Sequence, residues 1–327
     1  MAADRDAVLA HTTIVTGAAG FAGGHLLDRL AATGTVIGWH RPGSQPPRTS
    51  PPAVRWMAVD VTDRAAVAAA IADARPDRLF HLAGAASVET SWTNAVPHLR
   101  VNVIGTQHVL DAVARLPHPC RVVVVTSAQV YGASDAPITE DDPLRPQSPY
   151  GLTKLAQDRL AQAAAAADGL DVVVARPFNH IGPRQAPGFA VSSFARQIAQ
   201  IEHGLAPPVI AVGNLDTRRD ITDVRDVVDA YIRVMTHGQS GRAYNVCSGR
   251  AWRIRDLLDG LLRLSTTTIE VTTDPARFRP VDVPVVQGDP SRIQSETGWA
   301  PRIDIAQTLG DTLEWWRGET TGDARTA

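Results

Sequence analysis

Three polar residues in two short runs could perform proton-transfer chemistry. Ser127 follows an apolar β-branched run that starts at Val122, and Tyr150 and Lys154 stand four residues apart after Pro149. A spacing of four places two side chains on one face of a helix. An ammonium beside a phenol favours the phenolate and so lowers the phenol pKa. With a hydroxyl at hand to hold a substrate oxygen, the three residues could interconvert a carbonyl and an alcohol.

The motif is weak on its own, because a tyrosine and a lysine on the surface of an ordinary helix would look the same. Its meaning depends on the elements that position it. The run Val122–Val125 is typical of a buried parallel strand, which would deliver Ser127 to the carboxyl edge of a sheet. Lys154 is the only lysine of a chain that otherwise uses arginine for positive charge.

A glycine-rich turn near the N-terminus predicts an anion site. The apolar strand 12–16 is followed by Gly17, Gly20 and Gly23 and then by a helix. In this context the first glycine permits a tight turn, the second lets the backbone approach a pyrophosphate, and the third lets the helix pack on the strand. Free N–H groups at the helix start would bind the phosphates. A glycine turn without a ligand is the alternative.

The second predicted strand, 35–39, indicates which dinucleotide would bind. An acidic residue near its end would bond the ribose hydroxyls of NAD, but the strand ends in Gly-Trp-His-Arg without an acid. Arg41 suits a 2′-phosphate, so NADP(H) is favoured and NAD(H) is the alternative. A merely solvated Arg41 would remove this preference. Asp60, after the third strand, is a candidate partner of the adenine amino group, and Asp63 a candidate helix N-cap.

Strands and helices alternate up to Ala175, which predicts an α/β fold: a Rossmann-type doubly wound parallel sheet. We expect residues 1–175 to form an NAD(P)-binding domain and 176–327 mainly a smaller C-terminal α/β substrate-binding domain, with the chain returning to the first around 218–246. A long helix over about 94–115 should be interrupted near Pro97. The final helix is expected over 305–316, with a frayed polar tail from Gly318.

Composition narrows the partners and the compartment. The chain has 327 residues, 44% of them hydrophobic, and a net charge of −2, which argues against a nucleic-acid partner. No apolar run reaches the length of a membrane span, and the N-terminus lacks the pattern of a secretory signal. The two cysteines, Cys120 and Cys247, are expected to be buried free thiols in a reducing cytoplasm, with a disulfide as the alternative. We assign no metal ligands.

With these pieces in place, the chain resembles the extended short-chain dehydrogenase/reductase family that acts on nucleotide sugars. The resemblance follows the motifs TGAAGFAGGHL (16–26), HLAG (81–84), TSAQVYG (126–132), SPYGLTK (148–154) and RPFNHIGPR (176–184), in family order. The C-terminal half is most similar to the branch that reduces GDP-4-dehydro-6-deoxy-D-mannose, in VSSFARQIAQIEHG (191–204), VGNLDTRRDITDVRDVVDAY (212–231), YNVCSG (244–249), RFRPVDVP (277–284) and TGWAPRI (297–303).

The resemblance implies roles for individual residues. Tyr150 would donate a proton to the sugar C4 oxygen, Ser127 would share that hydrogen bond, and Lys154 would bond the nicotinamide ribose and lower the tyrosine pKa. The cofactor-binding set would be Gly17, Gly20, Phe21, Ala22, Gly23, Arg41, Asp60, Val61, Leu82, Ala83, Gly84, Tyr150, Lys154 and Pro177. The substrate-binding set would be Ser87, Gln129, Asn179, Arg219 and Arg279. Arginine forks suit the diphosphate of a nucleotide sugar; of the tandem Arg218 and Arg219, only one can point into a pocket from a strand.

One departure from the family pattern bears on the reaction. Related dehydratases and decarboxylases carry an acid two residues after the hydroxyl residue, where this chain has Gln129. A neutral amide cannot act as a general base near pH 7. The substitution argues against a 4,6-dehydratase, and it also weakens the match to the reductase branch, whose members often have an acid there. It leaves the hydride step intact.

The leading hypothesis is therefore NADPH-dependent reduction of a GDP-4-keto-6-deoxyhexose to GDP-D-rhamnose or its C4 epimer. A nucleotide-sugar 4-epimerase or UDP-glucuronate decarboxylase with tightly bound NAD is the alternative. A catalytically inactive relative that senses NADP and binds a protein is a third hypothesis, disfavoured because Ser127, Tyr150 and Lys154 all remain. The Ala- and Val-rich helices at about 95–115 and 150–168 suit a homodimer, although such helices could simply cover the sheet.

Overall fold

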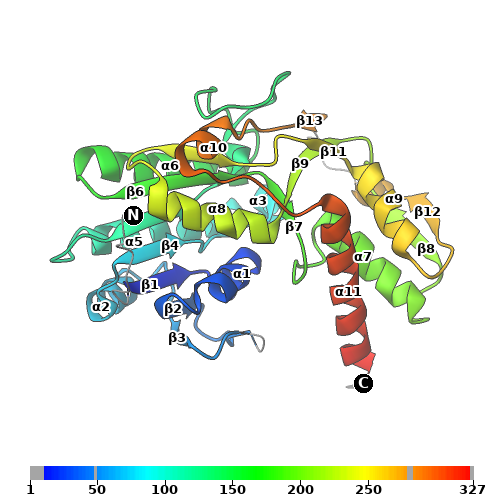
Figure 1. Cartoon of the computed structure of the whole chain (residues 1–327), viewed down its shortest axis with the longest axis horizontal. Helices are drawn as coiled ribbons and strands as arrows, with labels where there is room; N and C mark the ends of the chain where they lie inside the picture. Colours follow the sequence, from blue (N-terminus) through cyan, green and yellow to red (C-terminus); the bar gives the residue numbers. More distant parts are fainter. Residues whose placement is uncertain (1–10, 48–49, 278–282, 325–327) are drawn as a thin grey trace, which may run out of the picture.

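A parallel sheet of seven strands forms the centre of the computed structural model, which describes residues 11–47, 50–277 and 283–324. The strand order is β10-β6-β5-β4-β1-β2-β3, a Rossmann-type arrangement (Figure 1). The strands are β1 (His11–Thr16), β2 (Gly34–His40), β3 (Val54–Ala58), β4 (Arg78–His81), β5 (Arg121–Val125), β6 (Val172–Pro177) and β10 (Ala243–Val246). The predicted fold class is confirmed.

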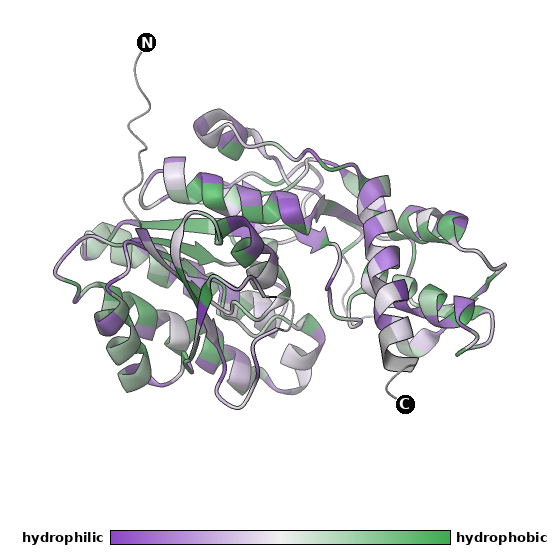
Figure 2. Cartoon of the chain, turned by 60° about the horizontal axis from the view of Figure 1, so that its bottom comes forward, coloured by the Kyte–Doolittle hydropathy of each residue, from purple (hydrophilic) through white to green (hydrophobic). Residues whose placement is uncertain are grey.

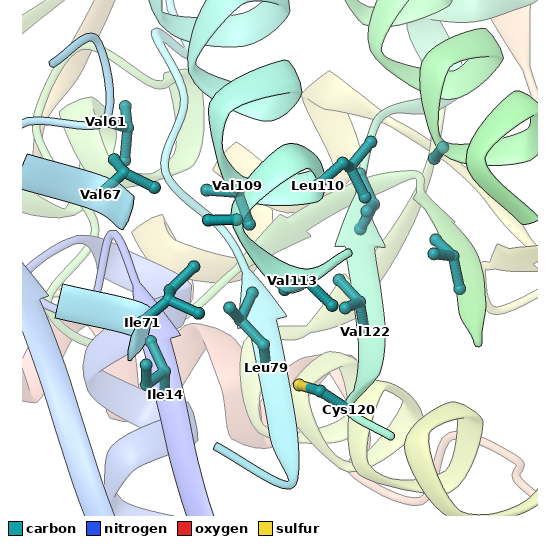
Figure 3. Packing of buried hydrophobic residues seen from close by; sticks show 14 of the residues in the cluster. Ile14, Val61, Val67, Ile71, Leu79, Val109, Leu110, Val113, Cys120 and Val122 are labelled. Carbon is teal, nitrogen blue, oxygen red and sulfur yellow. The ribbon is translucent and has the colours of Figure 1, made fainter. Parts of the chain in front are cut away.

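Helices cover both faces of this sheet. One face packs against α2 (Arg64–Ala74), α5 (Gly105–Val113) and α6 (Pro149–Ala167), and the other against α1 (Phe21–Leu30), α8 (Val224–His237) and α10 (Ser291–Thr297). Figure 3 shows the first of these cores, where side chains from α2 and α5 meet those of β1, β4 and β5. The N-cap of α2 is Asp63, as predicted, and Asp223 caps α8 in the same way.

The strand that leads to Ser127 shows why its sequence is a run of valines. Val122 and Val124 pack into the core on one face, Val123 packs into the core on the other, and all three are fully buried. A strand covered on both faces has no solvent side, so it reads as continuously apolar. Ser127 therefore follows a strand that is buried on both faces of the sheet.

A smaller lobe follows the sheet, at the right in Figure 1. It has a pair of strands, β8 (Val209–Val212) and β12 (Glu270–Thr273), and a sheet of β7 (Asn179–Ile181), β9 (Arg218–Asp223), β11 (Ala251–Arg253) and β13 (Val285–Val286). The helices α7 (Ala190–Glu202), α9 (Ile254–Leu264) and α11 (Ile305–Ala324) share its apolar core. Coloured by hydropathy, helices in both parts turn their apolar sides inward (Figure 2).

Two expectations about helices were wrong. Pro97 does not interrupt the helix predicted from about residue 94, because it lies in the first turn of α4 (Ala95–His98), where a missing N–H costs nothing. The irregularity follows instead, as a π-helical segment η1 (Leu99–Ile104) before α5. The tail from Gly318 is not frayed: α11 continues to Ala324 and packs on α7, and Arg317 pairs with Glu202 at 2.7 Å.

Both cysteines are buried and free, as predicted. No helix in the described ranges is long and apolar enough to cross a membrane.

Candidate active site

The site begins where β5 ends. Ser127 caps the short 3₁₀ helix η2 (Ala128–Val130), and its Oγ accepts a hydrogen bond of 3.1 Å from the backbone N–H of Gln129. This bond fixes the χ1 angle of Ser127. The hydroxyl proton remains available as a donor.

The start of α6 brings Tyr150 to the same place. Ser148 is the N-cap, accepting from the Gly151 N–H at 3.0 Å, and Pro149 occupies the first turn. A Cβ on Gly151 would stand 2.5 Å from the backbone oxygen of Gln129, so only glycine lets α6 approach η2 this closely. The backbone N–H of Tyr150 donates to Ser91 Oγ at 3.1 Å. Local caps and one glycine thus set the tyrosine against Ser127.

The Tyr150 phenol is buried and receives a hydrogen bond from the Ser127 hydroxyl. Burial raises the pKa of Tyr150 to about 12, and the serine hydrogen bond acts in the opposite direction. The balance differs from the lowering that the sequence favours, because removing the phenol from water outweighs the serine bond. The protonated phenol is the form that can donate a proton.

Lys154 stands one turn along α6 and is buried. Its Nζ donates to the backbone oxygen of Val125 at 3.2 Å and to Gln157 Oε1 at 2.7 Å. Burial lowers the pKa of Lys154 to about 7. Two of its three N–H donors have protein partners, so one remains for a ligand. A Cβ on Gly84 would approach Nζ to 3.3 Å, so the strand-end loop at β4 runs directly past the lysine.

Asn102 belongs to the site, although the sequence did not single it out. It is fully buried within η1, where its Oδ1 accepts from the Ala85 N–H at 2.8 Å and its Nδ2 donates to Thr153 Oγ1 at 2.9 Å. It therefore ties the loop after β4 to the helix that holds Tyr150 and Lys154. A buried asparagine in an otherwise apolar helical run was the available signal.

The glycine turn between β1 and α1 has the predicted shape. Gly17 has φ +65°, and a Cβ there would lie 2.7 Å from the Ala83 nitrogen. A Cβ on Gly23 would lie 2.3 Å from the Gly17 oxygen. Gly20 is the N-cap of α1, so no side chain caps the first N–H groups of this helix. The first turn of α1 thus keeps free N–H groups next to the loop Leu82–Gly84, where an anion can approach the backbone.

The other predicted cofactor residues lie around this edge. Arg41 is exposed just after β2. Asp60 Oδ1 accepts hydrogen bonds from the N–H and the hydroxyl of Thr62. The Val61 side chain packs directly against Gly105, where an added Cβ would lie only 2.9 Å from it. Phe21 stacks on His180 with ring centroids 5.7 Å apart. Ala22 is half-buried and Pro177 is buried.

The predicted substrate residues are less uniform. Gln129 is half-buried beside Ser127, and Asn179 is exposed at the start of β7. Ser87 already accepts from the Thr90 N–H as N-cap of α3 (Val88–Thr93). Arg219 Nη1 donates to the Val283 oxygen at 2.7 Å, which holds the side chain along β13. Arg279 lies outside the described residues.

A dinucleotide-type glycine turn, a seven-stranded parallel sheet and a Ser–Tyr–Lys site at its carboxyl edge define an enzyme of the extended short-chain dehydrogenase/reductase class. The model of the family described as GDP-mannose 4,6 dehydratase matches residues 14–312. The chain belongs to this family of nucleotide-sugar-modifying enzymes.

Known proteins similar to this chain differ in the reaction they catalyse. GDP-6-deoxy-D-mannose reductase of Pseudomonas aeruginosa is 38% identical over 244 residues, covering 74% of this chain and 80% of the relative. UDP-glucose 4-epimerase of Mycolicibacterium smegmatis is 31% identical over 316 residues, covering 94% and 99%. The solved structure of RMD from P. aeruginosa complexed with NADPH superposes with a TM-score of 0.82 at 33% identity, covering 94% and 99%.

Proposed function

We propose that this protein is an NADPH-dependent reductase that converts the C4 ketone of a GDP-4-keto-6-deoxyhexose to an alcohol, giving a GDP-6-deoxyhexose such as GDP-D-rhamnose. The single observation that supports it most is the composition of the site: Ser127, Tyr150 and Lys154 converge, and the neighbouring position is the neutral Gln129. Such a site can deliver a proton to a C4 oxygen but has no carboxylate at Gln129 to remove a C5 proton.

The glycine cradle supports a dinucleotide as the cofactor. A side chain at Gly17 would clash with the backbone of Leu82 and Ala83, and one at Gly23 with the backbone of Gly17 and Ala18. The N-terminus of α1 directs its free N–H groups to the same carboxyl edge of the sheet. Arg41, exposed and without an acid beside it, supports a 2′-phosphate and hence NADPH. NADPH is also the ligand of the similar P. aeruginosa structure. NAD(H) is the alternative cofactor.

In the proposed reaction the bound cofactor supplies a hydride to the sugar carbon. Ser127 and Tyr150 hold the ketone oxygen, and the protonated Tyr150 gives its proton to that oxygen as it becomes an alkoxide. Lys154 stabilises the resulting phenolate with its positive charge and uses its third N–H to hold the ribose. Leu82, Ala83 and Gly84 present backbone next to this lysine.

The proposed substrate site draws on both parts of the molecule. We assign residues 1–175, with the returning segment around 218–246, to cofactor binding and 176–327 mainly to the nucleotide sugar. Ser87 and Gln129 would face the sugar, and Asn179, Arg219 and Arg279 the diphosphate end, where guanidinium groups bind phosphate oxygens in pairs.

A nucleotide-sugar 4-epimerase or UDP-glucuronate decarboxylase that keeps its NAD is the competing function. It is favoured by the near full-length similarity to the M. smegmatis UDP-glucose 4-epimerase. The same Tyr150 and Ser127 would serve it, because an epimerase returns the hydride to C4. A 4,6-dehydratase is disfavoured by Gln129, whatever the description of the family model.

The test is to supply NADPH with GDP-, UDP- and dTDP-linked 4-keto-6-deoxy sugars and to identify the products by NMR. The proposal expects one NADPH oxidised for each GDP-6-deoxyhexose formed. Purification with tightly bound NAD, followed by turnover without added reductant, would contradict it.

We also propose a cytoplasmic homodimer. Four apolar side chains on the mutually packed segments α4, η1 and α6 are exposed, at 61% for Val96, 47% for Leu99, 49% for Ile104 and 57% for Leu152. A second copy placed on this face would remove them from water.

A further inference from the structure

Gln157, which has no part in the proposed reaction, is hydrogen-bonded directly to the proposed catalytic lysine. Gln157 lies three residues after Lys154 on α6, is fully buried, and accepts from Lys154 Nζ at 2.7 Å through Oε1. An ammonium has donors only, so the amide oxygen must be the atom that faces it. Its other end, Nε2, donates to Thr106 Oγ1 at 2.9 Å.

The hydrogen bonds beyond Gln157 fix its orientation. Thr106 Oγ1 donates to the backbone oxygen of Asn102 at 2.7 Å and has a further contact of 2.9 Å with His81 Nε2. Because the threonine proton is already committed, His81 Nε2 must be the donor in that contact. Nδ1 of His81 then accepts from Thr16 Oγ1 at 2.8 Å, and Thr16 accepts from the Ala83 N–H at 3.0 Å.

The donor and acceptor of every hydrogen bond in this network can be assigned in only one consistent way. Burial lowers the pKa of His81 to about 3, so the ring is neutral, as this pattern requires. Thr16, His81, Thr106 and Gln157 are all fully buried, so water does not compete for these bonds. A carboxamide held at one end by such a network has a fixed oxygen at the other.

We propose that Gln157 is a positioning residue for Lys154, whose amide oxygen fixes the direction of the ammonium group and favours its charged form. Among the residues that the structure describes, the lysine has two protein acceptors, the Val125 and Gln157 oxygens. Holding two N–H groups aims the third, and each acceptor stabilises the ammonium over the neutral amine. This inference rests on the proposed function only in giving Lys154 its part in catalysis.

Other charged groups do not replace this effect. The buried titratable side chains on the elements around Lys154 are Tyr150 and Asp158 on α6, His81 on β4, His98 on α4 and Arg176 on β6. The other charged or titratable side chains of these elements are at least partly exposed: Arg159 on α6, Arg78 on β4, Arg121 on β5, His108 and Asp111 on α5, Arg100 on η1 and Glu89 on α3. Asp158 is bonded to Arg176 at 2.8 Å, in a pair buried from solvent, so its charge is already matched. His81 and protonated Tyr150 are neutral at pH 7. The two carbonyl oxygens are therefore the groups that favour the ammonium.

The experiment uses the fact that Lys154 is the only lysine of the chain. Protein labelled with [¹³Cε,¹⁵Nζ]-lysine gives a single lysine signal, whose shift against pH reads the protonation of Lys154 without any substrate. We expect Gln157→Leu to lower the midpoint by about one pH unit, the effect of one lost bond to a charge. Gln157→Glu retains an oxygen beside Nζ and adds charge, so its midpoint should rise above that of the wild type.

A matched control is Gln162→Leu, because Gln162 lies on the same helix and bonds Asp158 rather than the lysine; its midpoint should equal that of the wild type. Thr106 keeps its bonds to His81 and Asn102 in Gln157→Leu, so this variant should fold, and its thermal melt checks that. If Gln157→Leu does not fold, Gln157→Glu still tests whether the residue at 157 shifts the Lys154 midpoint in the expected direction. An unchanged midpoint in folded Gln157→Leu, or no rise in Gln157→Glu, would overturn the proposal.

Turnover separates this inference from the proposed function. In an active reductase, Gln157→Leu should lower kcat about tenfold near pH 8 with the KM for the sugar nucleotide unchanged. If the wild type reduces no keto sugar while the Lys154 midpoints shift as expected, the positioning role stands and the reductase assignment fails. If the wild type is an active reductase and the midpoints coincide, the reverse holds.

Discussion

At the scale of single residues, the site places ionisable groups where their charged forms are costly. Burial raises the pKa of Tyr150 to about 12 and lowers that of Lys154 to about 7. Neither shift would be selected for stability alone, because a buried amine costs free energy of folding. Such shifts are characteristic of sites that move protons.

Replacing the lysine should therefore stabilise the protein while removing activity. Between about pH 7 and its ordinary pKa of 10.5, Lys154 binds fewer protons in the folded than in the unfolded chain. The free energy of unfolding of the wild type should consequently rise with pH across this window, by at most about 1.4 kcal/mol per pH unit from this group. We expect Lys154→Met to be more stable at pH 7, on the order of 2 kcal/mol.

Urea denaturation of the wild type and Lys154→Met from pH 7 to 10 measures the difference in their free energies of unfolding. The contributions of groups that titrate alike in both proteins cancel in this difference. The advantage of Lys154→Met should shrink steadily as the pH rises. A difference that stays constant over this range would show that Lys154 is not destabilised by burial.

The sequence singled out the residues that we propose to touch substrate or cofactor, but not the residues that support them. Ser127, Tyr150 and Lys154 lie in two short motifs, and local spacing is visible in a sequence. Apart from Lys154, the partners of Gln157 are Thr106 and, through it, His81, which precede it by 51 and 76 positions. Nothing in the sequence indicates these pairings. Only the packing of α5 and α6 on the sheet next to β4 brings them together.

At the scale of elements, close backbone packing makes the site. The glycine turn approaches the loop after β4, and the start of α6 approaches η2, at distances that no side chain would allow. Strands β1 and β2 of the central sheet were predicted within one residue of their observed bounds, as 12–16 and 35–39. Short elements such as α3, β7 and β11 were not predicted, because three to six residues offer too little periodicity.

Gly23→Ala should impair cofactor binding. Its Cβ would stand 2.3 Å from the Gly17 oxygen, which forces α1 away from the turn. We expect the Kd for NADPH to rise about tenfold or more, since a strain of 1–3 kcal/mol is typical of such overpacking. Fluorescence titration with NADPH measures it. Gly318→Ala in α11 is the control, because nothing lies within 4 Å of its Cβ, and an equal loss in both variants would contradict the role of the turn.

Asp158→Ala should destabilise the junction of α6 and β6. The pair of Asp158 with Arg176 is almost fully buried, so the variant leaves a guanidinium charge unmatched. We expect a loss of about 3–5 kcal/mol in urea denaturation. Asp229→Ala, which removes an exposed pair with Arg29, should cost less than about 1 kcal/mol. Similar losses in the two variants would show that burial of the first pair is unimportant.

At the scale of the whole molecule, the apolar face on α4, η1 and α6 lies directly outside the site. The same α6 holds Tyr150 and Lys154 on its inner side and exposes Leu152 on its outer side. A dimer through this face would buttress the catalytic helix. Amphipathic faces are visible in a sequence, but which of them stays exposed is known only once the fold is built.

Leu152→Glu should convert the proposed dimer to monomers, because it introduces a charge into the apolar face. Size-exclusion chromatography with light scattering should give a dimer for the wild type and a monomer for the variant. Leu205→Glu is the matched control, with 59% of Leu205 exposed just after α7 in the smaller lobe. A monomeric wild type would contradict the proposal, and so would two variants with the same oligomeric state.

The proposed reaction is a net reduction at C4, with a proton from Tyr150 and a hydride from the cofactor. The most direct measurement supplies NADPH deuterated at the transferred position together with a GDP-4-keto-6-deoxyhexose. We predict one deuterium at C4 of the product for each NADPH oxidised, and a rate lower by about a hundredfold or more in Tyr150→Phe. A product without deuterium, formed with no net oxidation of NADPH, would contradict the account.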